Sequence, residues 1–415
     1  MKILKITLAT FVIMLFAACD KDDAPQDTAL FAVPTIESLE TLRAGIRVEA
    51  PQQTNSDGKI YVAADMLFYI AQESGVHIFN NHNPAVPMNM AFINIPGVHD
   101  IAVKDNFLYA DNFVDLLVFD ISNINNITLV KTLQNAIQFY PAYPDDAEFY
   151  DWQIYPQEGE IVTGYALERR ARPEGENLLM AEDALASFNS SAAGVVGFGG
   201  SYAKFQINDN ALYTTDPYQL NVFNISEPAE TYFDKSVQMY FWLGGGQFET
   251  LFRQKDFLFV GATSGIYVVD ATDEFNPFFV SGFSHATACD PVVVDSNTAY
   301  ITVRGGNSCG AIQDQVNVID ITDITNPVLT STYLLDQPYG LGYRDNSLYV
   351  CCGSNGLKVF DTGNPAGLEL ENSYNVNVTD VIPLSTHLIA VGSNQIKQYN
   401  YGANHSLMPI STVNF

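Results

Sequence analysis

Lys358-Val359-Phe360-Asp361 places apolar residues before a closing acid, which is typical of a short β-strand that runs into a turn. The same phrase, ending in Asp or Asn, occurs seven times: Val76–Asn80, Leu117–Asp120, Asn221–Asn224, Tyr267–Asp270, Asn317–Asp320, Lys358–Asp361 and Lys397–Asn400. Consecutive copies end about 40 to 50 residues apart, except across one longer gap between Asp120 and Asn224. The chain is therefore built from a repeat.

Each repeat predicts four strands. Asp100–Val103 leads through a polar turn to a second strand, Phe107–Ala110, and the recurring phrase is the third. A turn that often contains Asn-Pro, as at Asn326–Pro327, introduces a fourth strand such as Thr128–Lys131. Four short antiparallel strands repeated around a ring are typical of a β-propeller, so the predicted fold is all-β.

Seven blades are predicted, over residues 59–96, 97–133, 203–238, 247–284, 288–336, 337–375 and 378–415. Six or eight remain open, because the two ends of a ring can share strands. Residues 39–50, with Ile46–Glu49 as an extra strand, would pair with a terminal blade. The predicted domains are a lipoprotein signal peptide over 1–18, an acidic tether over 19–38 and one propeller over 39–415, with an insertion at about 134–202.

The recurring phrase and its continuation resemble the LVIVD repeat of bacterial surface and secreted proteins. Phe360–Pro365 and Val318–Asp323 are the nearest copies, and the resemblance extends over nearly everything from residue 59 to the end, apart from the insertion. It implies a propeller fold and no established biochemical activity.

The N-terminus predicts export and lipid anchoring. Lys2 and Lys5 precede an apolar run, and Phe16-Ala17-Ala18-Cys19 resembles a bacterial lipobox, although Phe16 stands where Leu is usual. Acyl chains on Cys19, at about 0.8 kcal/mol per buried CH₂, would hold the mature protein on a membrane. The alternative is an ordinary secretory leader with a chance cysteine.

The predicted location is the cell envelope, at the outer membrane. The stretch Asp20–Asp23 resembles the acidic signal of surface-exposed lipoproteins in some Gram-negative bacteria, and a plain solvated tether is an equal alternative. The 47 acidic residues against 19 basic ones give a net charge of −28. Such a surface repels phosphate backbones, so no nucleic-acid partner is expected, whereas cations, glycans and envelope proteins remain as partners.

The inner strands predict a polar ring at one mouth of the central channel. Alignment of the repeats places His99, Glu249, Asp290 and Tyr339 at one position and Asp100, Lys204, Thr250 and Asp380 at the next. The candidate ligand or cation site is His99, Asp100, Glu249, Asp290 and Asp380. Converging carboxylates suit Ca²⁺, but no Asp-x-Asp-x-Asp loop accompanies them, and the alternative is a water-filled channel without a cofactor.

The insertion should cover the same face. Its aromatic first half, from Phe139 to Tyr155, would either stack on sugars or form a small core that pins the segment to the propeller. Glu160–Tyr165 alternates like a strand, and Glu168–Asp183 resembles a charged helix.

Four cysteines remain after acylation. A Cys289–Cys309 disulfide is a candidate, because both residues should lie on one face of one blade. Cys351 and Cys352 end a strand, so their side chains should point to opposite faces and stay as free, buried thiols.

Two functions fit these features. The leading one is a non-catalytic binding or scaffolding protein of the envelope, because the sequence has no nucleophile elbow and no HExxH pair. The alternative is an envelope hydrolase acting on carbohydrate through Asp100, Glu249, Asp290 and Asp380. The sequence leaves it open, because a two-carboxylate active site is defined by the distance between the carboxylates in the folded protein.

Overall fold

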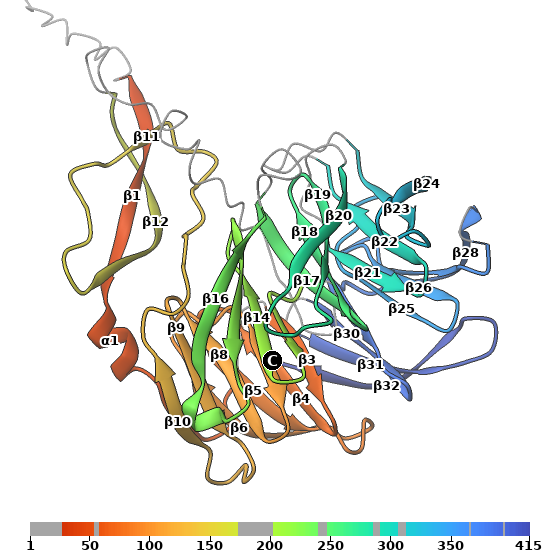
Figure 1. The fold of residues 1–415 in the computed structure, drawn as a ribbon, viewed down its shortest axis with the longest axis horizontal. Helices are drawn as coiled ribbons and strands as arrows, with labels where there is room; N and C mark the ends of the chain where they lie inside the picture. The colour runs from red at the N-terminus through yellow and green to blue at the C-terminus, as the bar shows by residue number, and fades with distance from the viewer. Residues whose placement is uncertain are drawn as a thin grey trace, which may run out of the picture.

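Seven sheets follow one another around a ring, and an eighth, smaller sheet projects from it (Figure 1). The computed structural model describes residues 27–53, 58–172, 202–239, 247–284, 291–305, 313–364, 367–392 and 395–415. Within these ranges no helix has the length and apolar composition needed to cross a membrane. The first strands of successive blades contact one another, which places them at the centre of the ring. The all-β propeller and its seven blades are confirmed.

The blades agree closely with the predicted ranges. Blade 1 contains β3 (Gly58–Ala63), β4 (Met66–Ala71), β5 (Gly75–Asn80) and β6 (Met88–Asn94); blade 2 contains β7 (Ile101–Lys104), β8 (Phe107–Asn112), β9 (Asp115–Asp120) and β10 (Thr128–Leu133). Blade 3 contains β13 (Phe205–Asn208), β14 (Ala211–Thr215), β15 (Gln219–Asn224), the 3-10 helix η1 (Pro228–Glu230) and β16 (Tyr232–Gln238); blade 4 contains β17 (Phe248–Gln254), β18 (Phe257–Ala262), β19 (Gly265–Asp270) and β20 (Phe278–Ser284). Blade 5 contains β21 (Val292–Asp295), β22 (Thr298–Val303), β23 (Gln315–Asp320) and β24 (Val328–Leu334); blade 6 contains β25 (Leu341–Arg344), β26 (Ser347–Cys351), β27 (Leu357–Asp361) and β28 (Glu369–Tyr374). Blade 7 contains β29 (Asp380–Pro383), β30 (His387–Gly392), β31 (Gln395–Tyr401) and β32 (Leu407–Asn414).

The Asp or Asn that closes a phrase has a local structural role in six of the seven copies. Asp120 Oδ1 accepts the backbone N–H of Ser122 at 2.8 Å, and Asp270 and Asp320 make the same bond to the residue two positions on. This side-chain turn ends the third strand and directs the chain toward the fourth. The recurrence of Asp and Asn is thus explained by turn geometry rather than by a shared ligand.

The ring closes by packing between blades 1 and 7. β2 (Arg47–Glu49) adds a fifth strand to the outer edge of β6, which confirms the predicted extra strand. Blade 7 takes all its strands from the C-terminal end of the chain. The seam is held by the stacked rings of Tyr69 and Phe415, 4.1 Å apart, and by a buried amide pair in which Asn81 and Gln398 bond reciprocally at 3.0 and 2.8 Å.

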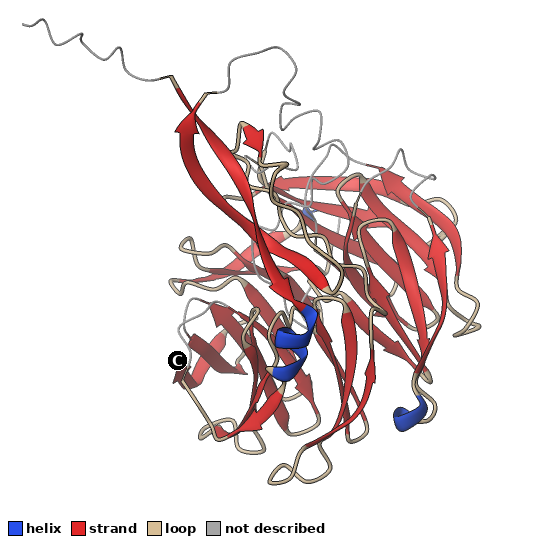
Figure 2. Cartoon of the chain, turned by 90° about the vertical axis from the view of Figure 1, so that its left-hand side faces the viewer, coloured by secondary structure: helices blue, strands red, loops and turns tan. Residues whose placement is uncertain are grey.

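The eighth sheet forms an arm, of which the sequence predicted the strand over Glu160–Tyr165 but not the pairing. β1 (Thr28–Ser38) pairs antiparallel with β12 (Glu160–Ala171) along its whole length and parallel with β11 (Phe149–Tyr150) (Figure 2). Residues 28–38, assigned to the tether, are therefore a strand. Glu168–Ala171 also belong to a strand, so the prediction of a helix beginning at Glu168 is wrong for these residues.

The insertion's aromatics pack mainly on the arm. Ala32 and Tyr143 are buried together, with Tyr150 and Tyr165 against them. This core forms because β1 offers a small residue opposite the rings. The expected core therefore exists, but its second wall is β1 rather than the propeller.

Helix α1 (Leu39–Ala44) joins the arm to the blades (Figure 2). Ser38 caps its first turn by accepting the Thr41 N–H. Arg43 forms a two-pronged ion pair with Asp115 of β9, at 2.7 and 2.8 Å, and only 1% of the Asp115 side chain is exposed. The base of the arm is thus fixed on blade 2.

Candidate functional site

Asp100 lies at the inner end of blade 2, directly before β7, and is buried. Its Oδ2 accepts the backbone N–H groups of Lys204 and Phe205, at the start of blade 3, and its Oδ1 accepts the N–H of Ile101. Lys59 Nζ, from β3 of blade 1, lies 3.4 Å from the same Oδ2. One carboxylate therefore joins three blades.

A second carboxylate organises the neighbouring residue. Asp111 Oδ1 accepts the N–H groups of His99 and Asp100, both at 2.7 Å, and its Oδ2 lies 3.1 Å from His99 Nδ1. Glu73 Oε1 lies 3.7 Å from the other ring nitrogen. Lys59, Asp100, Asp111, His99 and Glu73 form one chain of charged groups, which we call the mouth network.

Burial and pairing shift the pKa values in the mouth network. Burial lowers the pKa of Lys59 to about 8, against the opposing attraction of Asp100. Burial raises the pKa of Asp100, with Lys59 and the backbone N–H groups acting the other way. Burial acts to lower the pKa of His99, but its hydrogen bonds to Asp111 and Glu73 outweigh that effect, so the pKa is raised.

His99 also connects the mouth to the insertion. Its ring centroid lies 5.5 Å from that of Phe113 and 5.2 Å from that of Phe139, and the two Phe rings meet edge to face at 4.6 Å. Phe139 belongs to the first residues of the insertion. This ring contact is where the predicted pinning of the insertion to the propeller does occur.

Asp380 lies on another part of the ring. It begins β29 of blade 7 and is fully buried, and a Cβ on Gly340 of blade 6 would lie only 2.3 Å from its Oδ1. Burial raises the pKa of Tyr202, at the end of the insertion; Arg304 opposes this rise, and Asp380 adds to it. Arg304 itself sits over the Tyr339 ring at 4.5 Å. The end of the insertion thus approaches blades 5 to 7.

Of the four predicted site residues that the structure describes, it brings His99 and Asp100 together. His99 and Asp100 share Asp111, whereas Glu249 lies in β17 of blade 4 and Asp380 in blade 7. Asp290 lies outside the described residues. Among the residues that the structure describes, no group of three His, Cys, Asp or Glu side chains is arranged to hold a metal ion.

The cysteines agree in part with expectation. Cys351 and Cys352 are free and buried, in the hydrophobic clusters on opposite sides of blade 6, as strand alternation predicts. Cys19, Cys289 and Cys309 lie outside the described residues, so the lipid attachment and the candidate disulfide stay predictions.

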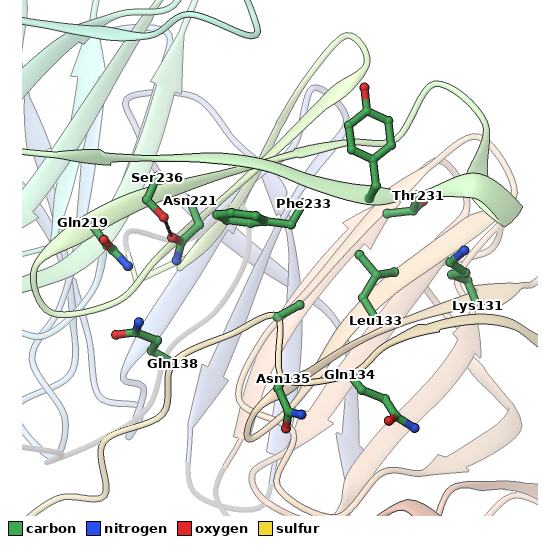
Figure 3. Close-up of a pocket in the computed structure, with 12 residues that line it drawn as sticks. Lys131, Leu133, Gln134, Asn135, Gln138, Gln219, Asn221, Thr231, Phe233 and Ser236 are labelled. Carbon is green, nitrogen blue, oxygen red and sulfur yellow. Dashed lines mark hydrogen bonds between the residues drawn. The ribbon is translucent and has the colours of Figure 1, made fainter.

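A groove of about 590 Å³ runs between blades 2 and 3 (Figure 3). One wall comes from the end of β10 and the first residues of the insertion, and the other from β15 and β16. Its lining consists of Lys131, Leu133, Gln134, Asn135, Ala136, Gln138, Gln219, Asn221, Thr231, Tyr232, Phe233 and Ser236. The volume falls within the range of about 300 to 1,000 Å³ that small-ligand sites occupy.

Two polar side chains of the groove are held in fixed orientations. Ser236 Oγ donates to Asn221 Oδ1 at 2.7 Å, and Asn221 Nδ2 donates to the buried Asp216 at 3.2 Å (Figure 3). The sequence analysis missed these residues because Asn221 reads as part of the repeated phrase. The available signal was the start of the insertion at residue 134, which supplies the opposite wall.

Comparison with known proteins agrees with the repeat. Residues 97–134 and 344–376 match the LVIVD repeat family, and these ranges correspond to blade 2 and most of blade 6. The chain carries LVIVD repeats. No curated protein matches the sequence.

Solved structures support the propeller at the level of fold. A protein from Lactobacillus plantarum superposes with a TM-score of 0.53 and 12% identity, covering 86% of this chain and 94% of its own. The periplasmic gluconolactonase PpgL of Pseudomonas aeruginosa superposes with a TM-score of 0.51 and 9% identity, covering 89% of this chain and 96% of its own. At these identities the likeness establishes the propeller fold alone.

Proposed function

We propose that this LVIVD-repeat propeller is a non-catalytic binding protein of the bacterial envelope, anchored through a lipid on Cys19. The observation that carries the proposal is the state of Asp100. Its oxygens accept three backbone N–H groups and face Lys59, so the carboxylate joins blades instead of facing a substrate. Glu249 and Asp380 also interact with other groups of the protein.

The arm supports display away from the membrane. β1 begins at the end of the arm remote from the blades (Figure 2), and its eleven residues span about 36 Å at roughly 3.3 Å per residue. A lipid on Cys19 would therefore attach beyond the tip of the arm. The blades and the groove would then face the surrounding medium.

The lipid anchor is tested by exchanging the sulfur of Cys19 for an oxygen. Cys19→Ser removes the thiol that accepts the acyl chains, so the protein should shift from the membrane fraction to the soluble fraction and lose incorporation of a labelled fatty acid. Cys351→Ser is the matched control, because that thiol is buried in the propeller. A Cys19→Ser protein that keeps its fatty-acid label would refute the anchor.

The binding role is tested on residues 20–415. Glycans, peptides and purified envelope proteins are offered as separate classes, and product formation is followed on the same samples. Saturable binding without product supports the proposal. Turnover that Asp100→Asn or Asp380→Asn abolishes would overturn it in favour of the envelope hydrolase.

A further inference from the structure

The groove between blades 2 and 3 is lined mainly by neutral polar groups. Carboxamides come from Gln134, Asn135, Gln138, Gln219 and Asn221, and hydroxyls from Thr231, Tyr232 and Ser236. Among the lining residues described, Lys131 carries the one charge. Such a lining favours a ligand that carries both hydrogen-bond donors and acceptors and has no net charge.

Carboxamide side chains are complementary to vicinal hydroxyl groups in their hydrogen-bond donors and acceptors. Each carboxamide offers one acceptor oxygen and two N–H donors, and a hydroxyl both donates and accepts. The Gln219 side chain donates to the buried Asp216 on one wall, whereas the structure gives no side-chain hydrogen bond within the described chain for Gln134 on the opposite wall. The Gln134 amide is therefore available to a ligand, and Gln219 keeps its oxygen and its second N–H for one.

The middle of one wall is preorganised. Because Asp216 accepts one N–H of Asn221 and Ser236 donates to its oxygen, the amide plane of Asn221 is fixed. The same two hydrogen bonds also fix the directions of the second N–H of Asn221 and of the lone pairs on Ser236 Oγ. Fixed polar groups lose little conformational entropy on binding, which favours a ligand that is itself polar.

The same wall carries an apolar platform. Phe233 of β16 is 43% exposed and packs edge to face on the buried Phe223 at 5.5 Å. Figure 3 shows its ring beside Asn221 and Ser236. An aromatic face beside amides is complementary to a pyranose ring, which has an apolar C–H face and a rim of hydroxyls.

Other ligand classes fit less well. A phosphate or carboxylate ligand would meet a single Lys and a protein of net charge −28. An apolar ligand would displace water from five carboxamides and would offer no hydrogen bonds in place of those that the water made. We propose that the groove binds a neutral oligosaccharide, an inference that rests on the proposed binding function and specifies its ligand class.

The experiment uses residues 20–415 and an array of short neutral oligomers of glucose, mannose, galactose and N-acetylglucosamine, followed by calorimetry with the best binder. Gln219→Ala and Phe233→Ala should each weaken the Kd about fivefold or more. Gln315→Ala and Phe278→Ala are matched controls on blades 5 and 4 and should leave the Kd within about twofold. Circular dichroism checks that each variant folds.

Salt separates a neutral ligand from a charged one. Raising the salt from about 50 to about 500 mM should leave the Kd unchanged, because no ion pair forms with the ligand. Loss of affinity in high salt, or sugar binding unaffected by both groove variants, would overturn the inference. Binding of a peptide that these variants weaken would overturn the sugar assignment and keep the binding function, whereas turnover of a sugar would overturn the binding function itself.

Discussion

Lys59→Met tests whether the mouth network holds the blades together. The substitution keeps an unbranched side chain that is one heavy atom shorter and removes its charge, which leaves the Asp100 carboxylate buried without a cation. Breaking one side of a buried ion pair costs about 3 to 5 kcal/mol. Because Asp100 keeps its bonds to the N–H groups of Lys204, Phe205 and Ile101, we expect a loss near the lower value.

The reverse substitution, Asp100→Asn, should depend on pH in a defined direction. Burial already lowers the pKa of Lys59 to about 8, below its unfolded value of about 10.4. Without the opposing charge the folded pKa falls further, so the unfolded chain binds more protons and stability rises with pH in this range. The loss caused by Asp100→Asn should therefore be smaller at about pH 9 than at about pH 7.

The double variant completes the cycle. Lys59→Met with Asp100→Asn removes both charges, and we expect it to be about 2 kcal/mol more stable than the sum of the single losses predicts. The assay is urea unfolding followed by far-ultraviolet circular dichroism. Lys104→Met is the control, because Lys104 donates to Asn210 rather than to a carboxylate, and it should cost less than about 1 kcal/mol. If the double variant loses as much free energy of unfolding as the two single variants together, the coupling between Lys59 and Asp100 is refuted.

Three further predictions concern the seam, the thiols and the mouth histidine. Gln398→Leu leaves the buried Asn81 amide without its partner and should cost about 1 to 3 kcal/mol in urea unfolding; no loss would mean that the seam does not depend on this pair. Burial raises the pKa of Cys352 to about 12 and that of Cys351 well above its usual range, so mass spectrometry should find neither alkylated before unfolding, and rapid native labelling would contradict this. His99→Gln should cost most below the unfolded pKa of about 6.5 and progressively less as pH rises through the raised folded pKa, and a loss that grows with pH would show the opposite shift.

The blades could be predicted because their signals are local. The turn made by Asp120 depends on a residue two positions away, and strands one to four of a blade pair with their nearest neighbours in sequence. Period-two alternation and turn residues therefore carry most of the information. The arm could not be found in this way, because Thr28 pairs with Ala171 and nothing near Thr28 indicates its partner.

The residues at the channel mouth show what alignment of the repeats can predict and what it cannot. It places Asp100 and Asp380 at the inner ends of their blades, which the structure confirms. It does not reveal that Asp100 binds Lys59. Lys59 stands at the position in blade 1 that Asp100 occupies in blade 2, so alignment shows the two as equivalent residues and not as a contact between blades. Whether a carboxylate faces a ligand or joins two blades depends on this neighbour.

The groove arises at the one place where the insertion interrupts the repeats. Blade 5 carries the same pattern as blade 3, since Gln315 and Asn317 match Gln219 and Asn221, and Thr332 donates to Asn317 as Ser236 does to Asn221. The repeat alone therefore supplies the polar wall in more than one blade. Blade 3 differs because the insertion begins beside it and provides a second wall. A deletion that rejoins β10 to β13 with a short linker should consequently abolish sugar binding even though Gln219 and Phe233 remain, and retained binding would place the ligand on blade 3 alone.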